Sequence, residues 1–480
     1  MNPILYWNEV ALEANRRDFS NVPETGKPKP EQGGPTLSSR ALAIVHLAMY
    51  DAHAGVVNKP DLPRYLPNPP NPAPGANAAA AVAAAAHACL VALYPRQAPH
   101  FELARAGAGV AGSGIAAGEA FGLAVAQAML ADRAADPGAG AGGYTSSNAR
   151  GRHREDPANP GQGFHAPFYG AQSKCFAVTA RHELMAPPAL TSNDYKKALE
   201  QVRHKGISPE LTGTLPKAQD KRSVDETLIG LYWAYDGARN LGTPPRLYNL
   251  IVREVSKVKS NTVDQDARLF ALVNAAMADA GILAWDQKYI HDFWRPVVGI
   301  REHDVSMGPA STTPKNNIDD NCDPNWLPLA APASNSSDRN FTPPFPAYPS
   351  GHATFGAAAL HTVRLFYGVP KGNRGPDTVF TGSFVSEELN GVTRDNDGNV
   401  RPRHRRSFTD GLWQAIVENG LSRVYLGVHW SFDAFDLTNG GKPDLSKNIG
   451  GVPLGLTIAE DIFTAGSGKA PVKSTVGPRS

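Results

Sequence analysis

The chain has little cysteine, little net charge and no long uninterrupted run of apolar residues. Its 480 residues include three cysteines, Cys89, Cys175 and Cys322, which are odd in number and far apart. They fit neither a disulfide framework nor a zinc-ligand spacing, so we expect packed or surface thiols. The formal net charge is +2, so nothing indicates bulk binding of nucleic acid or of an acidic membrane. Any positive site must be a local cluster.

Signals for export or membrane insertion are also missing. Residues 1–9 lack the basic start and apolar core of a signal peptide. No uninterrupted apolar run reaches the ~20 residues of a membrane helix. The alanine-rich stretch 77–94 comes nearest, but it contains His87 and is followed by Pro95. We expect a soluble chain without a membrane partner, cytoplasmic or exported by a route that the sequence does not reveal.

Helical spacing dominates the rest of the chain. Apolar periodicity and capping residues predict helices over residues 37–56, 77–94, 114–134, 222–235, 246–259, 264–294, 352–367, 408–430 and 451–464. Residues 377–385 alone suggest a strand. Stretches 57–76, 136–192 and 302–347 are rich in Pro, Gly, Asn or Asp and predict long irregular connections. The expected fold class is mainly α, with two helical bundles and long irregular loops.

The expected domain division has three parts. Residues 1–216 form an N-terminal helical region with a long surface loop, residues 217–470 form a helical bundle that carries the site, and residues 471–480 form a flexible tail.

A short internal echo bears on this division. Ser39-Arg40 precedes His46 by the same spacing as Ser422-Arg423 precedes His429, and Asp51 and Asp433 follow closely. Chance similarity between two amphipathic helices explains the echo. The alternative is a duplicated bundle in which only the second copy kept its chemistry.

The first stretch with candidate chemistry runs from Trp285 to Pro296. On one continuous helix, Trp285, Lys288, Asp292 and Arg295 would share a stripe, with Asp292 able to hold both cations. Pro296 predicts that the helix ends near Arg295. A solvated charged face is one interpretation. The apolar residues that flank the stripe favour a partly buried cationic site.

The second stretch is Pro349-Ser350-Gly351-His352. Pro346 and Pro349 disfavour a helix through this segment, whereas the residues after His352 are small and apolar and predict one. Ser350 and Gly351 would then lie at a helix N-terminus, where free backbone N–H groups and the helix dipole favour an anion. The alternative is a capping serine followed by a surface histidine.

The third stretch runs from Ser422 to Asp433. His429 and Asp433 are four residues apart, so the carboxylate can fix the orientation and tautomer of the imidazole. Arg423 lies six residues before His429, about 240° around an ideal helix. The two side chains therefore cannot point the same way from one straight helix, and a bend at Gly427 would bring them together. For His429 alone, a satisfied core histidine is the alternative.

The three stretches together supply three cations, neutral donors and two imidazoles. This set suits a compact tetrahedral oxyanion, because guanidinium forks, an ammonium and N–H or O–H donors can all point at its oxygens. One imidazole could bond to the central atom while the other moves protons. The residues concerned are Lys288, Arg295, Ser350, Gly351, His352, Arg423 and His429.

In this order, K-x6-R-P, P-S-G-H and S-R-x5-H-x3-D resemble the signature shared by vanadium-dependent haloperoxidases and the type 2 phosphatidic acid phosphatase superfamily. Residues 232–237 (YWAYDG), 345–348 (FPAY) and 159–170 (NPGQGFHAPFYG) are similar to the vanadium chloroperoxidase branch, so the resemblance covers most of the chain. It implies an enzyme with vanadate as cofactor that oxidises halide with hydrogen peroxide to hypohalous acid.

The resemblance also implies a role for each residue. His429 would ligate the vanadium of vanadate. The oxygens of vanadate would be held by Lys288, Arg295, Ser350, the backbone N–H of Gly351, and Arg423. His352 would be the acid–base that takes a proton from hydrogen peroxide, after which Lys288 would polarise the bound peroxide. Asp236 would orient Arg423.

Trp285 and Phe345 match the aromatic pair beside the halide in chloroperoxidases. Bromide-restricted relatives carry a histidine at the position of Phe345, so the resemblance implies oxidation of chloride as well as bromide and iodide.

Two alternatives use the same residues. In a soluble acid phosphatase, His429 would attack phosphorus and form a phosphohistidine, and His352 would protonate the leaving oxygen. In a non-enzymatic helical scaffold, the site would only bind an oxyanion. Hydrogen peroxide and halide are the expected small-molecule partners, while the sequence leaves open a small organic acceptor of halogen and the oligomeric state.

Overall fold

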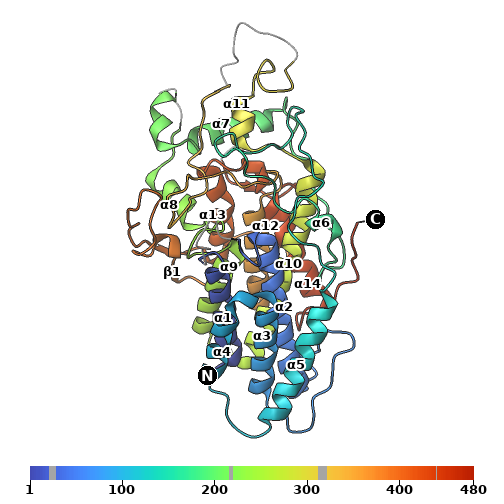
Figure 1. Ribbon diagram of the computed structural model, residues 1–480. Helices are drawn as coiled ribbons and strands as arrows, with labels where there is room; N and C mark the ends of the chain where they lie inside the picture. Colours follow the sequence, from blue (N-terminus) through green and yellow to red (C-terminus); the bar gives the residue numbers. More distant parts are fainter. Residues whose placement is uncertain (21–28, 216–219, 312–321, 439–440, 480) are drawn as a thin grey trace.

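A computed structural model describes residues 1–20, 29–215, 220–311, 322–438 and 441–479. Helices predominate (Figure 1): α1 (Pro3–Asp18), α2 (Gly34–Val57), α3 (Ala78–Leu93), α4 (Ala98–Gly107), α5 (Ile115–Asp132), α6 (Tyr169–Gln172), α7 (Asn193–Lys205), α8 (Val224–Tyr232), α9 (Pro244–Lys259), α10 (Val263–His291), α11 (Pro296–Arg301), α12 (Gly351–Phe366), α13 (Gly411–Tyr425) and α14 (Gly451–Ala465). The expectation of a mainly α fold with long irregular loops is confirmed.

The described strands are short and form two separate antiparallel pairs. Strand β1 (Ser383–Val385) pairs with β2 (Arg405–Ser407), with Phe384 opposite Arg406. Strand β3 (Asp436–Leu437) pairs with β4 (Pro443–Asp444). β1 lies at the end of the stretch predicted as a strand. The described residues also include four 3-10 segments: η1 (Pro95–Gln97), η2 (Pro209–Thr214), η3 (Glu387–Leu389) and η4 (Ser431–Asp433).

Helix α10 is the central element of the fold. Thr262 and Gln265 cap its start reciprocally, and almost every side chain from Asp266 to Lys288 is buried. It contacts α2, which in turn contacts α3 and α5, and it also contacts α12, which contacts α13 and α14. In Figure 1 the N-terminal helices gather at one end of α10, and α7 and α11 lie beyond its other end. This arrangement places the C-terminal part of α10 next to the start of α12.

Two described helices are long and apolar enough to cross a membrane by length and composition alone, namely α5 and α10. In α10, 94% of the most apolar window is buried inside the protein, and in α5 the share is 33%. Burial within the core therefore accounts for the apolar character of α10.

The predicted helices are all present, and three of them end three or more residues earlier than expected. The helix predicted over 222–235 ends at Tyr232. The helix predicted over 264–294 ends at His291, where Asp292 adopts a left-handed conformation with φ 46°. The helix predicted over 408–430 ends at Tyr425, and Gly427 follows with φ 73°. Glycine tolerates this backbone conformation and so allows the chain to turn there. Helices α1, α4, α6, α7 and α11 were not predicted.

Three observations bear on the predicted domain division. Its boundary at 216/217 lies outside the described residues. The described core of the N-terminal helices and that of the site-bearing helices belong to one continuous hydrophobic cluster. The tail expected to be flexible forms hydrogen bonds with the rest of the chain: Ser474 N–H donates to Phe176 O, and the Arg479 side chain donates to Asp286. The division stays a prediction.

The internal echo does not extend to local structure. His46 lies in the middle of α2, and Asp51 accepts hydrogen bonds from the backbone of Tyr65. His429 instead lies beyond the end of α13, and Asp433 holds its imidazole. A twofold relation between bundles stays a prediction.

Candidate functional site

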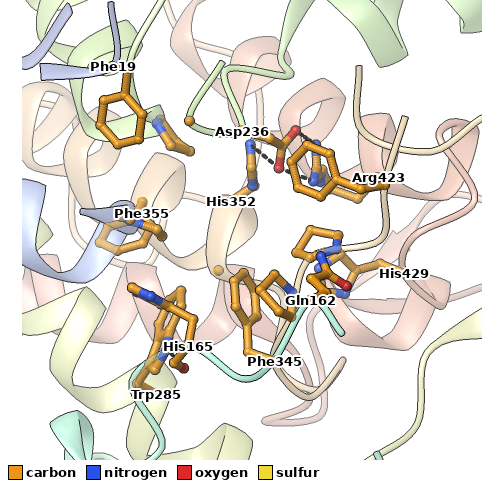
Figure 2. Close-up of a pocket in the computed structure, with 18 residues that line it drawn as sticks. Phe19, Gln162, His165, Asp236, Trp285, Phe345, His352, Phe355, Arg423 and His429 are labelled. Carbon is orange, nitrogen blue, oxygen red and sulfur yellow. Dashed lines mark hydrogen bonds and ion pairs between the residues drawn. The ribbon is translucent and has the colours of Figure 1, made fainter. Parts of the chain in front are cut away.

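The predicted site residues converge on one cavity of about 240 Å³ (Figure 2). Its wall includes Asp236, Trp285, Phe345, Gly351, His352, Arg423 and His429. Lys288, Arg295 and Ser350 lie behind this wall and are at most 1% exposed. The plain alternative of a solvated charged face is therefore wrong for this set.

Arg295 does not lie on the helix that carries Lys288. Helix α10 has already ended, and Arg295 is the residue that precedes α11. Its Nε donates to Phe345 O at 2.8 Å, and its Nη1 donates to Val428 O at 2.8 Å. Asp292, expected to hold both cations, instead accepts from Tyr144. The shared helical stripe is therefore wrong, although the chain still brings both cations to the site.

Lys288 is held by the turn that precedes α12. Its Nζ donates to the carbonyl oxygens of Pro346 (2.8 Å), Ala347 (3.1 Å) and Pro349. Its ammonium also lies 5.1 Å from the centre of the Phe345 ring. Burial, together with repulsion from Arg295, lowers the pKa of Lys288 well below its usual value.

Asp236 links Arg423 to His352, as Figure 2 shows. Its carboxylate accepts from both terminal nitrogens of Arg423, at 2.9 and 2.6 Å. One of its oxygens lies 3.9 Å from Nε2 of His352, and that nitrogen is 2.6 Å from Ala234 O. Burial, with a contribution from Arg423, lowers the pKa of His352 to about 3. The imidazole is therefore neutral near neutral pH.

His429 and Asp433 form the contact that their spacing predicted. Nδ1 of His429 lies 2.7 Å from Oδ2 of Asp433, and Nε2 lies 2.9 Å from Nη1 of Arg295. Because a carboxylate accepts, Nδ1 carries the proton and the Nε2 lone pair faces the cations. Burial, with repulsion from Arg295, lowers the pKa of His429 well below its usual value. Burial raises the pKa of Asp433 to about 7.

The start of α12 lies at the cavity, where Gly351 forms part of the wall. Ser350 caps the helix by accepting from Ala353 N, and its own N–H donates to Asp433 O at 2.8 Å. Gly351 lies in the first turn, where backbone N–H groups have no partner within the helix. A Cβ at Gly351 would lie 3.2 Å from the ring of Trp285. Glycine thus leaves room beside the ring.

The wall of the cavity contains residues that the sequence interpretation did not assign to the site, and His165 is one of them. The ring centres of Trp285 and Phe345 are 4.7 Å apart, and His165 lies about equally close to both, at 6.0 and 6.1 Å. The main-chain oxygen of His165 accepts from Nε1 of Trp285. Burial lowers the pKa of His165 to about 4. His165 belongs to residues 159–170, which resemble the vanadium chloroperoxidase branch, but no feature of that segment predicted that this histidine lines the cavity.

Several polar atoms of the site have no partner among the described residues. Nη2 of Arg295 and Nε of Arg423 are buried donors without an acceptor. Such donors are costly to leave unpaired, so their presence at the cavity fits a bound group rich in acceptor oxygens. Among the described residues, no group of three or more His, Cys, Asp or Glu side chains is arranged to hold a bare metal ion. The donor set therefore fits vanadate, an oxyanion that His429 could also ligate.

Comparisons with known proteins agree with this geometry. Residues 1–111 match the family profile described as the vanadium chloroperoxidase N-terminal domain, and residues 268–442 match that of the VCPO second helical-bundle domain. The chain is 35% identical to vanadium chloroperoxidase of Curvularia inaequalis, over 98% of this chain and 91% of that protein.

Solved structures show the same fold. A bacterial vanadium-dependent iodoperoxidase superposes with a TM-score of 0.59 at 18% identity, covering 97% of this chain and 96% of the other. The holo form of a bacterial vanadium-dependent chloroperoxidase gives 0.59 at 14% identity, covering 96% and 97%. The sequence match over nearly the whole length and the shared fold place this chain in the vanadium chloroperoxidase family of vanadium-dependent haloperoxidases.

Proposed function

We propose a specific division of roles among the site residues of this vanadium-dependent haloperoxidase, which oxidises halide with hydrogen peroxide and uses vanadate as its cofactor. The oxyanion would be held by Lys288, Arg295, Ser350, Gly351 and Arg423, and ligated by His429. The observation that supports this assignment is the convergence of buried, partly unpaired donors on the face of the cavity where the Nε2 lone pair of His429 points. When bound, vanadium(V) supplies Lewis acidity without changing its oxidation state.

His352 is the acid–base group in this proposal. Ala234 O can only accept, so the contact at 2.6 Å requires the proton of the neutral ring to sit on Nε2. Nδ1 is then the free base. With a pKa near 3, His352 is unprotonated near neutral pH and can take a proton from hydrogen peroxide. The nearby carboxylate of Asp236 stabilises the imidazolium that results.

Asp236 and Asp433 act through other residues. Asp236 fixes the guanidinium of Arg423 with two hydrogen bonds, and Asp433 fixes the imidazole of His429. When the oxyanion is bound, Lys288 would donate one hydrogen bond to an oxygen of that group. This bond would replace one of its three present hydrogen bonds to carbonyl oxygens.

Trp285 and Phe345 are proposed to face the halide. They line the same cavity as His352, and Lys288 lies within 5.6 Å of both ring centres. Aromatic edges and a nearby cation give a weakly hydrated place for a large anion. We expect oxidation of chloride as well as bromide and iodide. Oxidation of bromide without any oxidation of chloride by the vanadate-loaded protein would contradict this halide range.

The decisive experiment compares the metal-free protein with and without orthovanadate, in the presence of hydrogen peroxide, bromide and a halogen-accepting dye. Bromination that requires vanadate and is suppressed by excess phosphate would support the assigned oxyanion site. Hydrolysis of a phosphate monoester without halide oxidation under any vanadate condition would instead support the phosphatase alternative.

A further inference from the structure

We propose that the cleft outside the catalytic cavity binds an anionic aromatic acceptor of halogen, of the hydroxybenzoate class. The proposal rests on the proposed function, because halide oxidation in the inner cavity must supply the halogen. The acceptor would lie with its carboxylate at the rim of the cleft and its ring directed inward.

The outer cleft adjoins the catalytic cavity. Its volume is about 840 Å³, compared with about 240 Å³ for the inner cavity. The two share Phe19, Gln162, Gly237 and Phe341 in their walls, so they adjoin at these four residues, which we call the throat and take as the route between them. The irregular segments 159–165 and 333–345, which were predicted as long loops, supply much of both walls. Anything that leaves the inner cavity through this throat enters the cleft.

Charge at the cleft favours an anion. Arg239 and Arg339 both line it, both are exposed, and neither forms an ion pair with any described residue. Asp338 is the one acidic residue among the described residues of this wall. Further in, Arg423 lines the inner cavity and Arg295 lies behind it. Asp236 already pairs with Arg423 in the inner cavity, so the attraction for a negatively charged ligand is strongest at the rim of the cleft.

The rim is built from loops that are fixed to each other. The side chain of Asn335 donates to Arg239 O at 2.7 Å, and its backbone N–H donates to Arg394 O at 2.9 Å. Ser334 donates to Glu388, a fully buried carboxylate. These bonds hold the segment of Arg239 beside residues 334–335, and Arg339 follows shortly after in the same rim, so both arginines line one wall of the cleft.

The throat is suited to an aromatic ring. Phe19 and Phe341 line both cavities, and Pro343 and Pro344 continue the apolar surface into the inner cavity. Gln162 stands among them, and its Oε1 has no partner among the described residues. A ring on this surface with its carboxylate at the rim would direct its far edge, which bears the hydroxyl group, towards His352 and Arg423.

The chemistry of the acceptor step balances without another reagent. A ring carbon activated by the phenol hydroxyl attacks the halogen of hypohalous acid, the carbon–halogen bond forms and the halogen–oxygen bond breaks. The hydroxide that leaves takes the displaced ring proton and becomes water. Hydrogen peroxide remains the sole oxidant, and it is consumed when the halide is oxidised.

The test is a competition between 4-hydroxybenzoate and its neutral analogue 4-hydroxybenzamide. Vanadate-loaded enzyme receives both with hydrogen peroxide and bromide, and the ratio of brominated products is compared with the ratio given by reagent hypobromous acid at the same pH and salt concentration. We expect the enzyme to enrich the brominated benzoate several-fold, and the double variant Arg239→Gln/Arg339→Gln to lose this enrichment. The matched control Lys257→Gln/Lys259→Gln removes two exposed charges at the end of α9 and should keep it.

A binding measurement makes the proposal independent of turnover. Equilibrium dialysis of 4-hydroxybenzoate against the full-length protein should show binding that weakens about tenfold in the arginine double variant. Bromide oxidation with a product ratio equal to that of reagent hypobromous acid would overturn the acceptor site and leave the proposed function intact. Absence of halide oxidation would overturn the proposed function. If 4-hydroxybenzoate binds equally well to the wild type and to the arginine double variant, the acceptor site is overturned whether or not halide is oxidised.

Discussion

Asp236 and Arg423, which lie on different elements far apart in the sequence, form a two-pronged ion pair at 2.9 and 2.6 Å in the wall of the catalytic cavity. The side chain of Arg423 is fully buried, and that of Asp236 is 5% exposed. Such a pair fixes the plane of the guanidinium group and leaves Nε free to face a ligand.

Replacing Asp236 by Asn should damage both stability and the site. The variant leaves the charge of Arg423 buried without a counter-charge, which costs about 3 kcal/mol in the free energy of unfolding. Loss of the fork should also weaken vanadate binding by about tenfold or more. Denaturant unfolding and vanadate titration measure the two effects. Unchanged values in both would show that the pair neither stabilises the fold nor orients Arg423.

His429→Ala should abolish retention of vanadate and, with it, halide oxidation. The variant removes the imidazole nitrogen whose lone pair faces Arg295. Vanadium content after gel filtration is the direct measurement. His87→Ala is the control, because it removes an imidazole on α3 that pairs with Glu102 outside the cavity. Full peroxidase activity in His429→Ala would refute the ligand assignment.

Asp433→Asn tests the orientation of His429 without removing it. The amide of Asn can donate an N–H to Nδ1, which would favour the tautomer of His429 that carries its proton on Nε2. We expect vanadate affinity to fall by roughly 10- to 100-fold, the usual range for a partner of a ligating histidine. The dissociation constant measured by calorimetry decides the point, and wild-type affinity would mean that packing alone orients the ring.

Gly351→Ala tests the space beside Trp285. The new Cβ would lie 3.2 Å from the indole and would press it away from the start of α12. We expect a loss of vanadate affinity of about tenfold, since the backbone N–H at this position would shift from its place. Tryptophan near-ultraviolet circular dichroism should change with it. An unchanged spectrum together with unchanged affinity would show that the site tolerates a methyl group there.

The pH dependence of stability should carry a contribution from His46, which lies outside the site. Its Nδ1 lies 2.6 Å from Leu42 O and its Nε2 lies 2.8 Å from Asn8, and burial lowers its pKa to about 4. In the unfolded chain His46 has a pKa near 6.5, so between about pH 6.5 and pH 4 it is protonated in the unfolded chain but neutral in the folded one. This contribution is therefore complete above about pH 6.5 and is lost as the pH falls towards 4, by up to about 3 kcal/mol.

His46→Gln removes that proton uptake. Buried carboxylates titrate in the same range with the opposite sign, since burial raises the pKa of Asp51 and Asp279 to about 6. The informative quantity is therefore the difference in unfolding free energy between wild type and variant, which should shrink by up to about 3 kcal/mol from pH 7 to pH 4. A difference independent of pH would contradict the neutral state of His46.

Sequence reasoning located the site because its residues occur in local patterns that physical chemistry constrains. The spacing of His429 and Asp433 and the turn before α12 both gave contacts that the structure confirms. The reasoning failed where a helix end decided the geometry. Residues 285–295 have helical periodicity, yet Asp292 turns into the left-handed region, so Arg295 reaches the cavity from the chain before α11.

His165 shows the other limit of sequence reasoning. It belongs to a segment without periodicity, and its place in the cavity depends on long-range contacts: its N–H donates to Pro344 O, and Nε1 of Trp285 donates to its main-chain oxygen. No spacing within the sequence encodes such contacts. The bounds of helices such as α12 could be predicted to within a residue or two, because caps and apolar spacing are local.

The position of α10 has a consequence for how the molecule unfolds. One helix carries Trp285 and Lys288 and also packs on α2 of the N-terminal half. Both halves of the chain therefore pack on α10, and neither half can unfold without exposing the apolar surface of this helix to water. Heating should consequently produce a single calorimetric transition, and the loss of catalytic competence should follow it instead of preceding it.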